Sequence, residues 1–415
     1  MSLNASVKLS ARILPRGFRY AGAYCGIKKS GRLDLGWIVA DAPCAAAGVF
    51  TTNLIKAAPV VLCQSHMRRA ASRMRAVVVN SGNANCATGP DGMQASRATA
   101  VAAAQALGCK PEQILICSTG VIGVPLPVER ITDALPQLLP QLARNSQSYD
   151  ALAKSILTTD TRLKTAAASC RIGGRSVRVL GCAKGSGMIH PQMATMLAFI
   201  TTDARISPLL LQRALREVTA RTFNLITVDG DTSTNDTVLA FASAASGAPA
   251  IRGAAGRDYR NFVAALESVC QDLALAIVAD GEGAAHVVEI KVRGAASDAD
   301  AHRIAITIAH SPLVKTAVAG ADPNWGRILA AAGRAGAKLD PDRVEIWFGG
   351  IRMYGRPRAG GASRPLPFSE KVAHQRLLAD RVEILADLKI GRGQARAWTC
   401  DLTARYVEIN ASYRT

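Results

Sequence analysis

Apolar runs bounded by glycine and polar residues predict the strands of this chain. The run 75–80 is the clearest, because Ser81 and Gly82 follow it directly. A second apolar run, which is typical of a buried strand, begins at Met196. Residues 15–62 have the pattern of short strands and turns. Strands are predicted within that region at 34–40 and beyond it at 113–117, 176–182, 287–293, 303–309, 343–348 and 405–410.

Helical spacing of apolar positions predicts helices between these strands. The alanine-rich stretch 93–107 stops at Gly108, a residue that often ends a helix because it tolerates the left-handed conformation. Further helices are predicted at 145–157, 208–222 and 260–279. Because helices and strands alternate, the pattern predicts an α/β fold.

The length and composition are those of an ordinary globular protein. A chain of 415 residues with 49% hydrophobic content can bury a large core, and its length favours two or three domains. No run approaches the eighteen apolar residues of a membrane span, and no charged segment leads into a hydrophobic signal core. We therefore expect a cytoplasmic protein.

The cysteines and histidines do not have the spacing of a metal site. None of the ten cysteines forms a Cys-x-x-Cys pair, and the six histidines include no His-Glu-x-x-His helix. The acidic run from Asp229 to Asp236 lacks the terminal glutamate of an EF-hand. We expect buried thiols in a reducing compartment, no metal and no bound cofactor.

The formal net charge of +19 leaves two interpretations open. Residues 1–194 carry 23 Lys+Arg against 8 Asp+Glu, so most of the excess lies in this half, where it is spread rather than clustered. Aromatic residues make up only 5% of the chain, which disfavours nucleic-acid binding by base stacking. A positive field that attracts anionic substrates and a merely solvated basic surface both fit these numbers.

The stretch 184–203 carries the most specific chemistry. Two glycines, Gly185 and Gly187, precede the pair Ala194-Thr195, which stands just before the apolar run. A threonine hydroxyl becomes a good nucleophile when a base takes its proton, and the nearest base is its own α-amine, which exists only after the preceding peptide bond is cut. Self-cleavage at Ala194-Thr195 is therefore one hypothesis. An ordinary glycine-rich turn before a strand is the other.

Sequence blocks from residue 15 to the last residue resemble those of one family, in the same order. The central block reads Lys-Gly-Ser-Gly-Met-Ile-His-Pro-Gln-Met-Ala-Thr-Met-Leu, and others are Asn-Ser-Gly-Asn-Ala-Asn at 80–85, Ser-Thr-Gly-Val-Ile-Gly at 118–123 and Asp-Gly-Glu-Gly at 280–283. The chain resembles the glutamate N-acetyltransferase/ornithine acetyltransferase family of arginine biosynthesis, whose precursor splits between Ala and Thr. His190 and Gln192 depart from that family's usual Ala and Asn.

The resemblance implies a set of site residues. Thr119 and Gly120 match the pair that stabilises the oxyanion, although a strand ending in Ser-Thr-Gly is by itself more often a plain turn. The family also places a substrate-contacting threonine in the block 158–161, and Thr158 and Thr159 both remain candidates for it. The other implied substrate contacts are Lys184, Thr195, Glu282, Asn410 and Thr415.

The resemblance also implies the fold, the reaction and the assembly. It predicts a layered αββα sandwich of the self-processing ornithine acetyltransferase/aminopeptidase type, with a catalytic core at roughly 15–281 and a smaller α/β domain at 282–415. Cleavage would give an α fragment, 1–194, and a β fragment, 195–415, two of each forming a heterotetramer.

The implied reaction moves acetyl from N2-acetylornithine to Thr195 and then to glutamate, with acetyl-CoA as a further candidate donor. A self-processing N-terminal-threonine aminopeptidase or amidase is one alternative, and a non-enzymatic basic binding protein is the other. We expect neither nucleic acid nor membrane as a partner.

Overall fold

The computed structural model describes residues 13–190 and 196–411, and these residues form two compact units. Unit 1 runs from the first described residue to Asn224 and from Asp231 to Ile277. Unit 2 comprises Leu225–Gly230 and the described residues from Val278 onward. Ala194, Thr195 and Thr415 therefore lie outside the described residues.

Unit 1 contains an eight-stranded mixed sheet in the order β4-β3-β2-β8-β7-β6-β5, with β1 paired to β2. The long strand β2 joins two halves, because its first residues pair with β3 and its last residues pair with β8. Strands β3 and β4 are parallel, as are β7 and β8. The strands are β1 (Phe18–Ala23), β2 (Leu35–Phe50), β3 (Met74–Asn83), β4 (Ile114–Val121), β5 (Lys164–Ile172), β6 (Arg175–Lys184), β7 (Leu197–Thr202) and β8 (Thr237–Ala242).

The two halves of this sheet share one hydrophobic core. Val77 of β3 packs in the same buried cluster as Leu180 of β6 and Phe199 of β7. A hydrogen bond of 3.0 Å between the hydroxyls of Tyr20 and Thr201 also joins the halves. Since successive side chains of a strand point to opposite faces, the neighbouring residues of β3 are left to face the helices outside.

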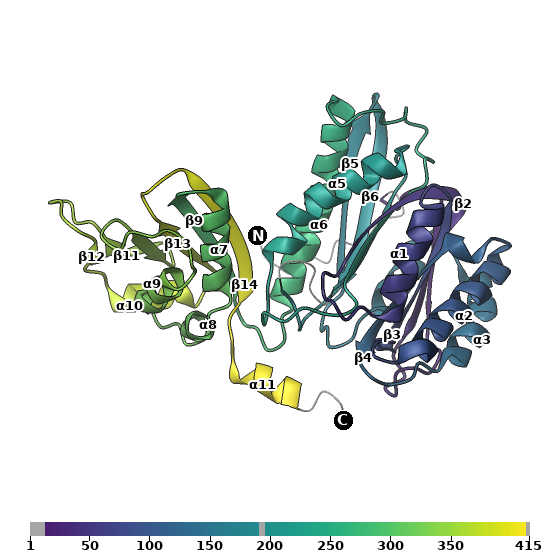
Figure 1. Cartoon of the computed structure of the whole chain (residues 1–415), viewed down its shortest axis with the longest axis horizontal. Coiled ribbons are helices and arrows are strands. Elements are labelled where there is room, and N and C mark those ends of the chain that lie inside the picture. The colour runs from purple at the N-terminus through teal and green to yellow at the C-terminus, as the bar shows by residue number, and fades with distance from the viewer. Residues whose placement is uncertain (1–12, 191–195, 412–415) are drawn as a thin grey trace. The chain divides into compact units, whose positions relative to one another are not determined.

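Helices cover the outer faces of both halves of unit 1. Val78 of β3 packs in a second cluster with residues of α2 and α3, while Leu273 of α6 approaches Gly181 of β6. Figure 1 shows α2 and α3 outside β3 and β4, and α5 and α6 outside β5 and β6, so the predicted αββα order is confirmed. The helices are α1 (Ala58–Ala70), α2 (Gly89–Leu107), α3 (Val128–Leu138), α4 (Ser146–Ser155), α5 (Pro208–Arg221) and α6 (Arg257–Ala279), with short 3-10 helices at Pro111–Gln113, Leu139–Gln141 and Phe223–Leu225.

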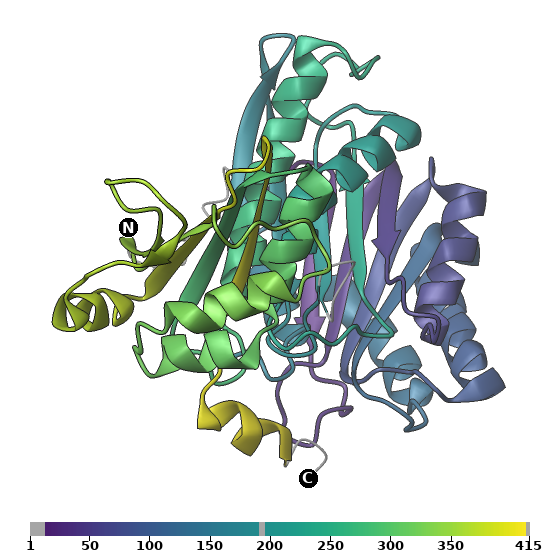
Figure 2. The same cartoon turned by 60° about the vertical axis from the view of Figure 1, so that its left-hand side comes forward.

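Unit 2 contains a six-stranded sheet in the order β12-β11-β10-β13-β9-β14, in which β13 and β9 are parallel. Helices pack on one face, and Figure 2 shows the green helix α7 beside the yellow strand β14. The elements are β9 (Val287–Ala295), α7 (Asp298–Ala309), α8 (Pro312–Ala319), α9 (Trp325–Gly333), β10 (Glu345–Phe348), β11 (Ile351–Gly355), β12 (Arg364–Pro365), α10 (Glu370–Leu377), β13 (Arg381–Asp387), β14 (Gly393–Cys400) and α11 (Ala404–Ala411).

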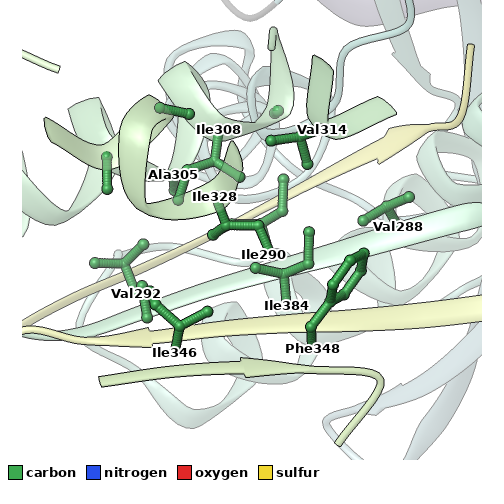
Figure 3. Packing of buried hydrophobic residues seen from close by; sticks show 14 of the residues in the cluster. Val288, Ile290, Val292, Ala305, Ile308, Val314, Ile328, Ile346, Phe348 and Ile384 are labelled. Carbon is green, nitrogen blue, oxygen red and sulfur yellow. The ribbon is translucent and has the colours of Figure 1, made fainter. Parts of the chain in front are cut away.

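The core of unit 2 lies between that sheet and those helices. Ile290, Ile346 and Ile384, from three neighbouring strands, meet Ile308 of α7 and Ile328 of α9 (Figure 3). All five side chains are buried. Branched aliphatic side chains of this kind fill a sheet–helix interface well, so unit 2 has its own core.

Two predicted strands are helices. The segment 303–309 lies within α7, where Ile304, Ala305, Ile308 and Ala309 are all buried at helical spacing and Ser297 caps the first turn. The segment 405–410 lies within α11. β-branched residues in both segments favour a strand. In α7 the burial of one face of the helix and the N-cap stabilise the helix instead.

The helix α6 has the length and hydropathy of a membrane span, and it is the one described helix that does. More than half of its apolar window is buried inside the protein, with Phe262, Val269 and Leu273 fully enclosed. A buried core helix satisfies the same length and composition criteria, and this burial accounts for its apolar sequence. All ten cysteines are free thiols, and most are buried.

Candidate active site

The ends of β4 and β6 bring a lysine and a threonine together in unit 1. Lys184, the last residue of β6, donates a hydrogen bond from Nζ to Thr119 Oγ1 of β4 at 3.2 Å. Both side chains are buried. Because β4 and β6 belong to different halves of the sheet, this contact lies where the two halves approach each other.

Gly120, the next residue of β4, lies against the backbone of β3. Its φ is +135°, and a Cβ at this position would come within 2.3 Å of the Gly82 carbonyl carbon and 2.5 Å of the Asn83 nitrogen. Only glycine fits such an approach without moving β3. The Thr-Gly pair is therefore held by the sheet, with Thr119 buried and Gly120 partly exposed.

Ser118, the residue of β4 that comes before Thr119, is held by two asparagines. Ser118 Oγ donates to Asn80 Oδ1 at 2.6 Å, and Asn235 Nδ2 donates to the Ser118 carbonyl at 2.8 Å. Asn83 and Asn85 are likewise engaged, the first with the Val124 carbonyl. The amides of the block 80–85 therefore bond within the fold.

The predicted threonine block lies next to the glycine turn after β6. Thr159 Oγ1 and Ser186 Oγ are 2.7 Å apart, and Asp160 Oδ1 accepts a hydrogen bond from the Gly185 nitrogen at 2.7 Å. The Thr158 nitrogen donates to Asp160 Oδ2 at 3.0 Å. Thr159 is thus the residue whose hydroxyl reaches the turn, whereas Thr158 contributes its backbone.

A buried ion pair sets the charge at this turn. Lys164 Nζ lies 2.7 Å from Asp160 Oδ1, with both side chains almost fully buried. Burial would raise the pKa of Asp160, but the charges of Lys164 and Lys184 outweigh it and hold that pKa well below its usual range. Lys28, whose pKa burial lowers to about 8, adds a further basic group near Asp160 and Lys184.

The residue directly after Thr195 is anchored on two sides. The Met196 nitrogen donates to Asp236 Oδ1 at 2.9 Å, and the Met196 carbonyl accepts from the Thr237 nitrogen at 3.1 Å. Asn235, the residue before Asp236, donates from Nδ2 to the Ala84 carbonyl at 2.7 Å. Asp236 is fully buried.

Two other predicted residues meet in unit 2. Asn410 of α11 donates from Nδ2 to Glu282 Oε2 at 2.8 Å, although 128 positions separate them. Thr403 Oγ1 donates to the Gly283 carbonyl at 2.7 Å, and a Cβ on Gly283 would come within 2.6 Å of the Tyr406 nitrogen. The turn that holds Glu282 is therefore packed closely against the start of α11.

The structure thus divides the predicted site residues into three sets. Thr119, Gly120 and Lys184, with the threonine block at 158–159, gather in unit 1, and Glu282 and Asn410 gather in unit 2. Ala194, Thr195, Gln192 and Thr415 lie outside the described residues. His190 is described and is partly buried.

Sequence reasoning missed two carboxylates of this site, Asp160 and Asp236. Both stand in blocks that were singled out for other reasons, and nothing in their spacing shows that they are buried. The one sequence signal that could have pointed to them is that each is a charged residue in a block of mostly small, polar residues. Among the described residues, no group of three or more His, Cys, Asp and Glu side chains is placed to hold a metal ion.

Comparison with known proteins identifies the family. The ArgJ family model matches residues 19–415, which is nearly the whole chain. The chain belongs to the ArgJ family. Curated relatives named arginine biosynthesis bifunctional protein ArgJ are 49% identical in Symbiobacterium thermophilum (97% of this chain, 98% of that one) and 48% identical in Geobacter sulfurreducens (96% and 99%).

Solved structures of ArgJ-family proteins are similar in sequence. An ArgJ structure from Bacillus halodurans is 45% identical, covers 52% of this chain and 98% of that one, and has a TM-score of 0.48. A Mycobacterium tuberculosis ornithine acetyltransferase complexed with ornithine is 34% identical, covers 43% of this chain and 92% of that one, and has a TM-score of 0.37. The predicted family is confirmed, and with it an acyltransferase of arginine biosynthesis.

Proposed function

We propose that this ArgJ-family chain moves an acetyl group from N2-acetylornithine to glutamate through an ester on Thr195. The observation that carries the proposal is the hydrogen bond between Lys184 and Thr119, beside the main chain that leads to Thr195. It brings together a buried cation, a buried hydroxyl and the adjacent Gly120 backbone. These are the groups that an acyl transfer with an anionic amino-acid substrate needs.

The chain first cuts itself between Ala194 and Thr195. The fragments are then α, 1–194, and β, 195–415, and the α-amine of Thr195 becomes the base for its own hydroxyl. Its reference pKa of about 8 suits a general base near neutral pH. Asp236 and Thr237 anchor Met196, the residue that follows the new terminus, directly before β7.

Thr119 and Gly120 stabilise the oxyanion of the tetrahedral intermediate. A lysine ammonium can only donate, so Thr119 Oγ1 accepts the bond from Lys184 and keeps its own hydrogen for another acceptor. The positive charge of Lys184 also strengthens that hydroxyl as a donor. Gly120 supplies its backbone N–H, and the contact with β3 fixes the direction of this group.

Two of the proposed substrate contacts pair a charged side chain with a substrate group of opposite charge. Lys184 is a compact cation that suits an α-carboxylate, and Thr159 is the better placed of the two threonine candidates because its hydroxyl reaches the 184–187 turn. In unit 2 the carboxylate of Glu282, oriented by Asn410, suits an α-ammonium group. Thr415 completes the proposed set.

Several partners belong to the same proposal. The M. tuberculosis relative was solved with ornithine, and we expect ornithine, N2-acetylornithine and glutamate to use one pocket in turn. Acetyl-CoA acts as a second donor, in keeping with the bifunctional relatives. Two α and two β fragments form the heterotetramer, and the enzyme works in the cytoplasm.

Trapping the acetyl group tests this proposal. Protein incubated with excess N2-acetylornithine and no glutamate is digested, and the peptide that begins at Thr195 is expected to carry one acetyl group, which glutamate then removes. The Thr195→Ala variant is expected to remain one chain of 43.5 kDa and to transfer nothing. A single uncut chain with normal transfer would refute the mechanism. Release of free acetate without any glutamate requirement would favour the aminopeptidase or amidase alternative.

A further inference from the structure

A turn rich in cations, residues 28–32, lies beside the candidate site of unit 1. This basic turn reads Lys-Lys-Ser-Gly-Arg and connects β1 to β2. A Cβ on Gly82 of β3 would come within 3.0 Å of Lys28 Cγ, and the backbone of Gly82 is also the place where Gly120 approaches β3. The basic turn therefore adjoins the Thr-Gly pair at the end of β4.

Lys28 and Asp34 hold the basic turn in place. Lys28 Nζ donates to the Leu33 carbonyl at 2.8 Å and to the Leu157 carbonyl at 2.6 Å. Asp34 is buried, and its two oxygens accept hydrogen bonds from the backbone nitrogens of Cys25 and Lys28 at 2.7 and 2.9 Å. The backbone of the turn is therefore anchored on both sides by the fold itself.

Three cations in this region are exposed. Lys29 and Arg32 belong to the basic turn, and Arg130 of α3 donates from Nη1 to the carbonyl of Gly26, just before the turn. Arg32 Nη1 lies 3.5 Å from the Thr158 carbonyl oxygen, at the threonine block. In the part of the chain that the structure describes, no carboxylate pairs with any of the three. These cations are therefore open to an anion at the rim of the site.

The two proposed acetyl donors differ in the anionic groups that they would bring to this rim. N2-Acetylornithine has one carboxylate, for which Lys184 is the proposed partner. Coenzyme A has several phosphate groups on its nucleotide, and its long pantetheine arm separates them from the thioester. With the thioester in the site, the phosphates lie outside it. Arginine and lysine side chains are common partners of phosphate groups.

We propose that Lys29, Arg32 and Arg130 bind the phosphate groups of acetyl-CoA, an inference that rests on the proposed function. Each guanidinium can give two parallel hydrogen bonds to a phosphate, and Lys29 adds a point charge. Lys28 positions the turn and is not itself a ligand. Because N2-acetylornithine has no phosphate, the three cations determine how well the enzyme binds acetyl-CoA and not how well it binds N2-acetylornithine.

The double variant Lys29→Gln/Arg32→Gln tests this binding site. It removes two exposed charges and leaves Lys28 and Asp34 to hold the turn. We expect KM for acetyl-CoA to rise about tenfold or more, because charge-assisted contacts are lost, while KM for N2-acetylornithine stays the same. In the natural protein KM for acetyl-CoA should also rise with ionic strength, since salt screens exposed charges, and this rise should be smaller in the double variant.

Acetylpantetheine, which has the thioester arm but no phosphate, gives a second measurement. Its KM with the natural protein should exceed that of acetyl-CoA about tenfold or more, and it should not change in the double variant. Equal KM values for the two thioesters in the natural protein would overturn the inference. This comparison decides even if the double variant does not fold.

Arg68→Gln/Arg69→Gln is the matched control. It removes two exposed charges from the last turn of α1, shortly before β3 begins, whereas the basic turn lies near the end of β3. KM for both donors should stay at the natural value in this control. An equal rise in KM for acetyl-CoA in both double variants would reduce the effect to net charge and overturn the inference.

The other outcomes separate this inference from the proposed function. A Lys29→Gln/Arg32→Gln variant with the natural KM for acetyl-CoA would overturn the inference and leave transfer from N2-acetylornithine untouched. A natural protein that uses N2-acetylornithine but not acetyl-CoA would remove the second donor, and this inference with it. A natural protein that transfers acetyl from neither donor would refute the proposed function.

Discussion

Lys184 and Thr119 are in direct contact although 65 positions separate them in the chain. The lysine ends β6 and the threonine lies near the end of β4, so the contact forms only when the two halves of the sheet of unit 1 pack together. One lysine thereby touches the proposed oxyanion donor and carries the charge proposed for the substrate carboxylate. If these proposed roles hold, substrate binding and oxyanion stabilisation are coupled through this contact.

Thr119→Val should slow catalysis with little change in substrate affinity. Valine keeps the shape of threonine but removes the hydroxyl that we propose donates to the oxyanion. Loss of one such donor lowers kcat by about a hundred- to a thousandfold. Steady-state kinetics with N2-acetylornithine and glutamate give the measurement, and Thr132→Val, at an exposed hydroxyl of α3, is the control. An unchanged kcat would remove Thr119 from the oxyanion site.

Gly120→Ala should destabilise unit 1. The new methyl group would lie 2.3 Å from the Gly82 carbonyl carbon at a φ of +135°, so β3 or β4 must move. We expect a loss of at least about 2 kcal/mol in the free energy of unfolding. Gly123→Ala is the control, because Gly123 has a φ of +79° but no atom within 4 Å of the added carbon. Equal melting temperatures for the two variants would contradict the role of this close approach.

Much of the fold could be predicted because local patterns agree with the tertiary packing. The apolar run 75–80 lies within β3, and the alanine-rich stretch that stops at Gly108 lies within α2, whose last turn Gly108 caps at a φ of +62°. The prediction failed at 303–309, where isoleucine spacing fits a strand and a helix alike. Only the buried stripe against β9 and β14 separates the two.

The candidate site was only partly predictable. Motif blocks pointed to Thr119 and Lys184, but the value of Asp160 and Asp236 comes from their burial, which no local pattern reveals. No local pattern predicts that the segment 225–230 belongs to unit 2 either. Lys315 anchors it there by donating to the Val228 carbonyl at 2.7 Å, a contact between residues 87 positions apart.

Asp160→Asn should weaken the fold and remove an acid-dependent part of its stability. Lys164 would lose its buried counter-charge, which costs about 3–5 kcal/mol. Because the folded-state pKa of Asp160 is depressed, its contribution is present above the unfolded-state pKa of about 4 and is lost as pH falls through the folded-state value. Denaturant unfolding at pH values on both sides of that window gives the measurement.

Asp41→Asn is the control for this comparison, because Asp41 pairs with Arg19 at an exposed position. Such a pair contributes no more than about 1 kcal/mol. We therefore expect its free energy of unfolding to follow that of the natural chain at every pH. An Asp160→Asn variant as stable as Asp41→Asn at neutral pH would show that the buried pair does not hold the turn after β6.

Glu282→Gln should raise KM for the amino-acid substrates more than it lowers kcat. The amide keeps an oxygen that accepts the bond from Asn410 Nδ2, so the turn stays in place, but the negative charge proposed to meet the α-ammonium group is lost. Loss of one charge-assisted contact corresponds to about a tenfold rise in KM or more. Glu408→Gln, an exposed residue of α11 paired with Arg405, is the matched control and should leave KM unchanged. If both variants have the natural KM, Glu282 orients α11 and does not bind the substrate.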